Sequence, residues 1–147
     1  MLGVHMRSVL PRSNLEVLKD MPKDQWSIRD YTNILYTAFP TNQFLVMQDH
    51  VAWVELQPKA HDRTILRLST LAPRAELTGE KADHWKQNHQ ITSVTLGEDF
   101  AINEAVQSGF ESGVNTALTF GRYEGALDSF NLEVERAIER NRQAVAA

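Results

Sequence analysis

Residues 31–71 have the sequence YTNILYTAFPTNQFLVMQDHVAWVELQPKAHDRTILRLSTL, and this stretch decides the fold. It is rich in aromatic and β-branched residues, which favour strands. Pro40, Pro58 and the polar pair Asp49-His50 interrupt it and act as turn or strand-end signals. The stretch therefore predicts an antiparallel meander of four strands, at residues 31–39, 44–48, 51–56 and 64–71.

The last of these segments also predicts which side of the sheet is buried. Ile65 and Arg67 alternate with Leu66 and Leu68. Because successive side chains of a strand point to opposite faces, this alternation indicates one buried and one solvated face.

The segment before the meander predicts a further strand at residues 5–10. Ser13 and Glu16 then fit a capping box, with serine at the N-cap and glutamate three positions later. A short helix at about residues 15–19 is the expectation.

After residue 73 the apolar period changes from that of a strand to that of a helix. A long helix is predicted from Thr78 or Gly79 to Ser108. Gly97, near its middle, indicates a kink or a place of close packing, and Gly109 is a natural residue to follow the helix end.

A last helix is predicted from Tyr123 or Glu124 onward. Its apolar residues fall on one stripe at spacings of three and four, so this stripe should be buried against the sheet. The stripe consists of Leu127, Phe130, Val134, Ala137 and Ile138.

The whole chain, residues 1–147, is therefore predicted to be one α+β domain, with 1–73 mainly strands and 74–147 mainly helices. An antiparallel sheet packed on a long C-terminal helix is a helix-grip, or START-like, arrangement. Such an arrangement forms a cavity between sheet and helix that suits apolar ligands.

Composition excludes several classes of protein. The 147 residues include no cysteine, which excludes a disulfide framework and a cysteine-ligated metal cluster within this chain. The net charge of -4 argues against a nucleic-acid binder. No apolar run approaches the roughly 20 residues that span a bilayer, and the first residues do not resemble a secretory signal. A cytoplasmic location is the expectation.

Five histidines are candidate ligands, and their spacing gives little support to a metal site. His84 and His89 are five residues apart on the predicted helix, about 140° around its axis, so they converge only if the helix is distorted. His5, His50 and His61 are interpreted as surface or turn residues.

Three carboxylates, Glu98, Asp99 and Glu104, lie on the same predicted helix. Phe100, Ala101 and Ile102 give Asp99 apolar neighbours, which is less usual for a purely solvated carboxylate. Spacing alone leaves open whether these groups are functional or simply charge the helix surface.

Residues 98–113, EDFAINEAVQSGFESG, nevertheless resemble the E-D-x-x-x-x-E-x-x-Q-x-G-x-x-S segment of Rieske-type aromatic-ring-hydroxylating oxygenase α subunits. Other segments are similar to this family in the same order. They are His5-Met6-Arg7 with Leu10-Pro11, residues 34–40, residues 45–50, Pro58 with Asp62-Arg63-Thr64, Trp85 with Asn88-His89, and Gly121-Arg122-Tyr123 with Glu124-Gly125 and Phe130.

The resemblance implies a mononuclear Fe(II) held by two histidines and one carboxylate, in a domain that hydroxylates aromatic or other apolar substrates with dioxygen. It implies Asp99 as the carboxylate ligand. Residues on the same side of the helix, Thr92, Thr95 and Leu96, are expected to line the substrate pocket. Glu104 and Gln107 are expected to support the motif.

The sequence departs from the family in one large way. The Rieske domain that would carry a [2Fe–2S] cluster has no counterpart, and the two iron histidines of the family belong to an upstream segment that this sequence lacks. The chain is therefore predicted to be the C-terminal part of a catalytic domain, with an incomplete helix-grip sheet and no activity alone. The intact enzyme would take electrons from a reductase or ferredoxin, and a homo-oligomer is compatible with it.

Two other interpretations stay open. One is a non-catalytic helix-grip domain that binds a hydrophobic small molecule. The other is a structural remnant whose half-sheet pairs with another chain.

Overall fold

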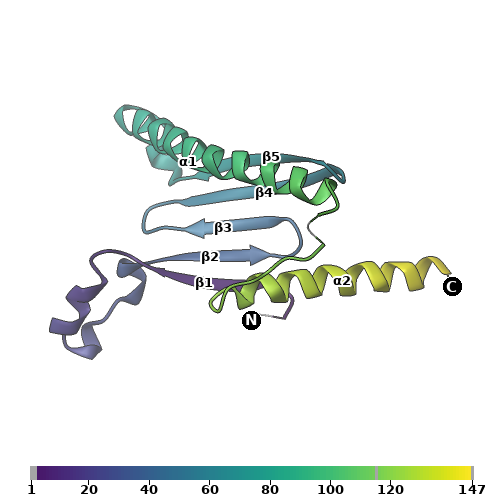
Figure 1. Cartoon of the computed structure of the whole chain (residues 1–147). Coiled ribbons are helices and arrows are strands. Elements are labelled where there is room, and N and C mark those ends of the chain that lie inside the picture. Colours follow the sequence, from purple (N-terminus) through teal and green to yellow (C-terminus); the bar gives the residue numbers. More distant parts are fainter. Residues whose placement is uncertain (1–2, 115, 147) are drawn as a thin grey trace.

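The computed structural model describes residues 3–114 and 116–146. Five strands form one antiparallel sheet in the order β1-β2-β3-β4-β5, so each strand pairs with its neighbour in sequence. Two long helices follow the strands (Figure 1). This is the predicted α+β arrangement, a sheet and a long helix in a helix-grip-like fold. The elements are β1 (Met6–Pro11), β2 (Thr32–Ala38), β3 (Asn42–Val46), β4 (Val51–Ala60), β5 (Arg63–Leu71), α1 (Glu80–Glu111) and α2 (Gly125–Ala146).

The five strands overlap the ranges that the sequence predicts, with two differences. β3 runs from Asn42 to Val46, whereas the prediction is residues 44–48. β4 continues through Pro58 to Ala60, although proline was expected to end it. Glu55 is the last β4 residue paired with β3, and the Leu56 N–H still donates a hydrogen bond to the Thr41 carbonyl at 2.8 Å. Beyond Leu56, among the described residues, β4 is paired with β5 alone. Proline is tolerated in such a partly unpaired strand because one side of its backbone needs no ladder hydrogen bond.

The segment between β1 and β2 holds three short 3-10 helices, at Leu15–Asp20, Lys23–Gln25 and Ile28–Tyr31. The capping-box prediction is wrong. Asn14 occupies the N-cap of the first helix, and no side chain makes a capping hydrogen bond there.

The two faces of the sheet differ as the alternation in β5 predicts. Ile65 and Arg67 are exposed, whereas Leu66 and Leu68 are half-buried. On the face that carries Ile65 and Arg67, Arg67 pairs with Glu55, and the Phe44 and Trp53 rings stack with their centroids 5.7 Å apart. The other face carries Thr70, which contacts α1 through His89.

Helix α1 is continuous over 32 residues and lies along β5 (Figure 1). The predictions for its glycines are wrong. The helix runs through Gly97 without a break, and a Cβ built on Gly97 would meet no atom within 4 Å. Gly109 lies inside the helix, and Gly113, with a φ of 71°, follows the helix end instead. Glycine is favoured there because a left-handed backbone is strained for other residues.

Helix α2 touches the sheet over only part of its length. Phe130 packs edge-on against Phe39 at 5.5 Å, at the turn between β2 and β3. Leu127 and Ile138 stay about half exposed, and Glu133 is the buried residue of the helix. The predicted burial of the whole apolar stripe is therefore wrong, because α2 extends past the strands (Figure 1).

The set of buried residues is small. In the part of the chain that the structure describes, its hydrophobic members are Met6, Leu18, Ala52 and Trp85. No helix among these described residues is long and apolar enough to cross a membrane.

Candidate functional site along helix α1

One side of α1 faces the sheet, and the spacing of the residues determines which side chains lie on it. Trp85 is buried, and His89, Thr92, Leu96 and Phe100 are half-buried. These positions recur every three or four residues, and at about 100° per residue they fall within one narrow sector of the helix.

Asp99 lies on the flank of this sector, about 60° around the axis from Leu96. Its carboxylate is exposed. Thr92 and Thr95 occupy the same flank, and each hydroxyl donates a hydrogen bond back to the helix, Thr92 to the Asn88 carbonyl at 3.1 Å and Thr95 to the Ile91 carbonyl at 3.0 Å.

The structure therefore places the four predicted residues, Thr92, Thr95, Leu96 and Asp99, on one side of the helix, but it does not enclose them together. Thr95 lines a shallow groove on the surface of α1 with Gln87, Gln90, Ile91 and Val94. Pocket and ligand roles for these residues stay predictions.

A larger groove of about 650 Å³ lies between the C-terminal half of α1 and the β4–β5 hairpin. Its apolar lining comes from Leu56 and Leu66 of the sheet and Phe100 of the helix. Glu104 and Gln107, expected to support the acidic motif, also line it. The remaining lining residues are His61, Asp62, Arg63, Thr64 and Asn103.

His84 and His89 have separate surroundings. The His84 ring packs edge-on against Trp85 at 4.7 Å, and His89 Nδ1 lies 3.0 Å from the Thr70 hydroxyl. Because α1 is unbroken, Asp99 lies about 15 Å from His89 along the axis. The pair and Asp99 thus do not converge on one ion.

His50 was interpreted as a surface or turn residue, and its burial contradicts a surface position. Its side chain is only 5% exposed, and its ring tilts against Trp85 at 5.3 Å. Its Nδ1 lies 2.7 Å from Asp49 Oδ1, and the ring N–H must donate because a carboxylate only accepts. This hydrogen bond lowers the pKa of the Asp49 carboxyl below its ordinary value of 3.8.

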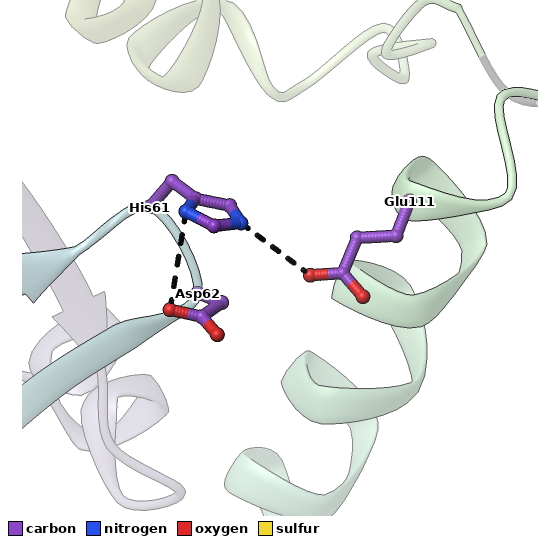
Figure 2. A group of neighbouring side chains, drawn as sticks. All are labelled: His61, Asp62 and Glu111. Carbon is purple, nitrogen blue, oxygen red and sulfur yellow. Dashed lines mark ion pairs between the residues drawn. The ribbon is translucent and has the colours of Figure 1, made fainter.

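The sequence does not predict one cluster of potential metal ligands. His61 and Asp62 at the tip of the β4–β5 hairpin lie beside Glu111 at the end of α1 (Figure 2). His61 and Asp62 are neighbours in sequence, but nothing in the sequence links them to a glutamate 49 positions later.

Taken together, the fold is an antiparallel sheet with a long helix that shares a partly apolar groove with it. The sequence of residues 7–140 matches the family of ring hydroxylating alpha subunits (catalytic domain). The chain belongs to this family. No curated protein and no solved structure gives a match.

The iron implied by this family needs two histidines beside a carboxylate. In residues 3–114 and 116–146, one group of at least three potential ligands converges, and it consists of His61, Asp62 and Glu111. Asp99 is not part of it. The described residues alone therefore do not fit a three-ligand iron centre at Asp99.

Proposed function

We propose that this chain acts as the C-terminal part of the catalytic domain of a non-haem iron Rieske oxygenase, which hydroxylates aromatic or other apolar substrates with dioxygen. The observation that carries the proposal is the family match over residues 7–140. The chain is inactive alone, because its sequence has no cysteine for a Rieske [2Fe–2S] cluster and Asp99 has no histidine partners among the described residues.

In this proposal Asp99 supplies one iron ligand, and the two histidines and the cluster come from residues outside those described. The exposure of Asp99 supports this, because a carboxylate on the flank of α1 is accessible to a further segment packed there. Thr92 and Leu96, half-buried on the adjoining side, would contact the substrate. A reductase or ferredoxin supplies the electrons, and the enzyme works in the cytoplasm.

The test is iron content and hydroxylation in an assembly that combines this chain with a Rieske domain and two histidine ligands. Asp99→Ala should remove the iron and the activity. Asp83→Ala is the matched control, because Asp83 is an exposed aspartate of the same helix that pairs only with Lys86 among the described residues. His84→Ala and His89→Ala should keep the iron. Full iron occupancy in Asp99→Ala would refute the ligand assignment.

A second candidate function is the binding of a hydrophobic small molecule without catalysis. The apolar lining of the groove by Leu56, Leu66 and Phe100 favours it, and the volume of about 650 Å³ lies in the ordinary range of ligand pockets. A fluorescent apolar probe should then bind the metal-free 147-residue chain, and Leu66→Gln should weaken this binding. Equal binding by Leu66→Gln and wild type would place the probe elsewhere.

A further inference from the structure

The β4–β5 hairpin and the last turn of α1 bring together three potential metal ligands from distant parts of the chain. His61 Nδ1 lies 4.0 Å from Asp62 Oδ1, and His61 Nε2 lies 4.0 Å from Glu111 Oε1 (Figure 2). One donor atom from each residue can be chosen so that all three lie within 4.8 Å of one another.

This spacing is close to what a small cation requires. Nitrogen and oxygen ligands lie about 2.0–2.2 Å from Zn²⁺, which puts neighbouring ligand atoms about 3–3.5 Å apart. The two carboxylates lie beside different ring nitrogens of His61, and one ion binds only one of these nitrogens. The ring therefore has to turn so that one nitrogen faces both carboxylates, and the donor atoms have to approach by roughly 1 Å. All three side chains are at least half exposed, so rotamer changes can supply this movement without disturbing the core.

The type and orientation of the donors indicate which cation fits. One imidazole with two carboxylates suits a first-row transition ion, whereas Mg²⁺ prefers oxygen ligands alone. Gln107 Nε2 donates a hydrogen bond to Glu111 Oε1 at 3.2 Å and so orients this carboxylate. Such supporting hydrogen bonds are usual around metal ligands.

We propose that His61, Asp62 and Glu111 bind one divalent transition-metal ion, with Zn²⁺ held more tightly than Mg²⁺. The ion would join the hairpin tip to the C-terminal turn of α1. Glu111 lies 12 residues beyond Asp99, about 18 Å along the helix, so this site does not use the carboxylate proposed for iron. His61 and Asp62 also line the groove beside Gln107, so the ion would fix one end of the groove.

Calorimetric titration of Zn²⁺ into the metal-free 147-residue chain tests the proposal. Wild type should bind one ion, and His61→Ala, Asp62→Asn and Glu111→Gln should each weaken binding at least tenfold. His84→Ala and Glu80→Gln are matched controls, an exposed histidine and an exposed glutamate of α1 outside the cluster and the groove, and should bind as wild type does. Mg²⁺ should not compete. Absence of binding, binding that survives the three cluster substitutions, or equal losses in the controls would overturn the proposal.

Hydrogen exchange distinguishes a bridging ion from an ion on His61 alone. Zn²⁺ should slow exchange both at the β4–β5 turn and in the last turn of α1, and His61→Ala should abolish both effects. Protection of the hairpin without protection of α1 would contradict the bridge. Circular dichroism of the variants should match wild type, because the substituted side chains lie on the surface.

Discussion

Trp85→Ala should detach the first half of α1 from the sheet. Trp85 is 6% exposed, and among the described residues it is the one buried residue of α1. A buried tryptophan removes about 150–250 Å² from water. At about 25 cal/mol per Å² this corresponds to about 4–6 kcal/mol, an upper bound because the unfolded chain also buries some apolar surface.

We therefore expect Trp85→Ala to lower the free energy of unfolding by about 3–5 kcal/mol and the melting temperature by about 10 °C. Trp85→Phe should cost clearly less than Trp85→Ala, because phenylalanine leaves a smaller cavity. It keeps most of the apolar contact and removes an indole N–H that is buried without a hydrogen-bond partner among the described residues.

Urea denaturation followed by far-UV circular dichroism measures these differences without relying on the fluorescence of the replaced residue. Ile91→Ala is the control on the same helix, where the side chain is 61% exposed, and should change stability by less than about 1 kcal/mol. If Trp85→Ala stays within about 1 kcal/mol of wild type, Trp85 does not anchor α1 as the structure indicates.

Three further predictions concern single residues. Gly97→Ala should raise the free energy of unfolding by about 0.5–1 kcal/mol, because the new methyl group meets no atom within 4 Å and alanine favours the helix; a loss of stability in urea denaturation would contradict the open surroundings of Gly97. Asp49→Asn should lower stability by at most about 1 kcal/mol, because the side chain is largely exposed. Since the folded-state pKa of Asp49 is depressed, its contribution is present above pH 3.8 and is lost as the pH falls below it, so urea midpoints of wild type and variant should converge on acidification; a constant difference would refute the linkage. Val9→Lys should weaken any self-association measured by sedimentation velocity, because Val9 is 51% exposed on the edge strand β1 and a charge there opposes strand pairing. Val17→Lys, away from the sheet, should leave self-association unchanged. Equal effects of the two variants would exclude pairing through β1.

The strands could be predicted because their signals are local. Pro40 and the Asp49-His50 pair separate β-branched runs, and the alternation from Ile65 to Leu68 assigns the faces of β5 before any tertiary contact is known. The prediction that Pro58 ends the strand is wrong because β3 does not extend opposite Pro58, and the relative lengths of neighbouring strands are a property of the sheet.

The site was less predictable because it depends on long-range placement. The position of Asp99 on one side of α1 with Thr92 follows from helical geometry alone. The burial of His50 requires Trp85 to pack over it, and the meeting of His61 with Glu111 requires α1 to end beside the hairpin. Neither distance in sequence nor residue type contains that information.

The small buried set has a calorimetric consequence. A fully packed chain of 147 residues would show a heat capacity change of unfolding of about 1.8–2.2 kcal/mol/K. Because so few hydrophobic side chains are removed from water here, this chain alone should fall below that range and show a broad, shallow thermal transition. A partner that covers the apolar side chains still exposed on β1 and α1 would raise the heat capacity change toward the ordinary value, so calorimetry can detect a completed assembly without knowledge of its substrate.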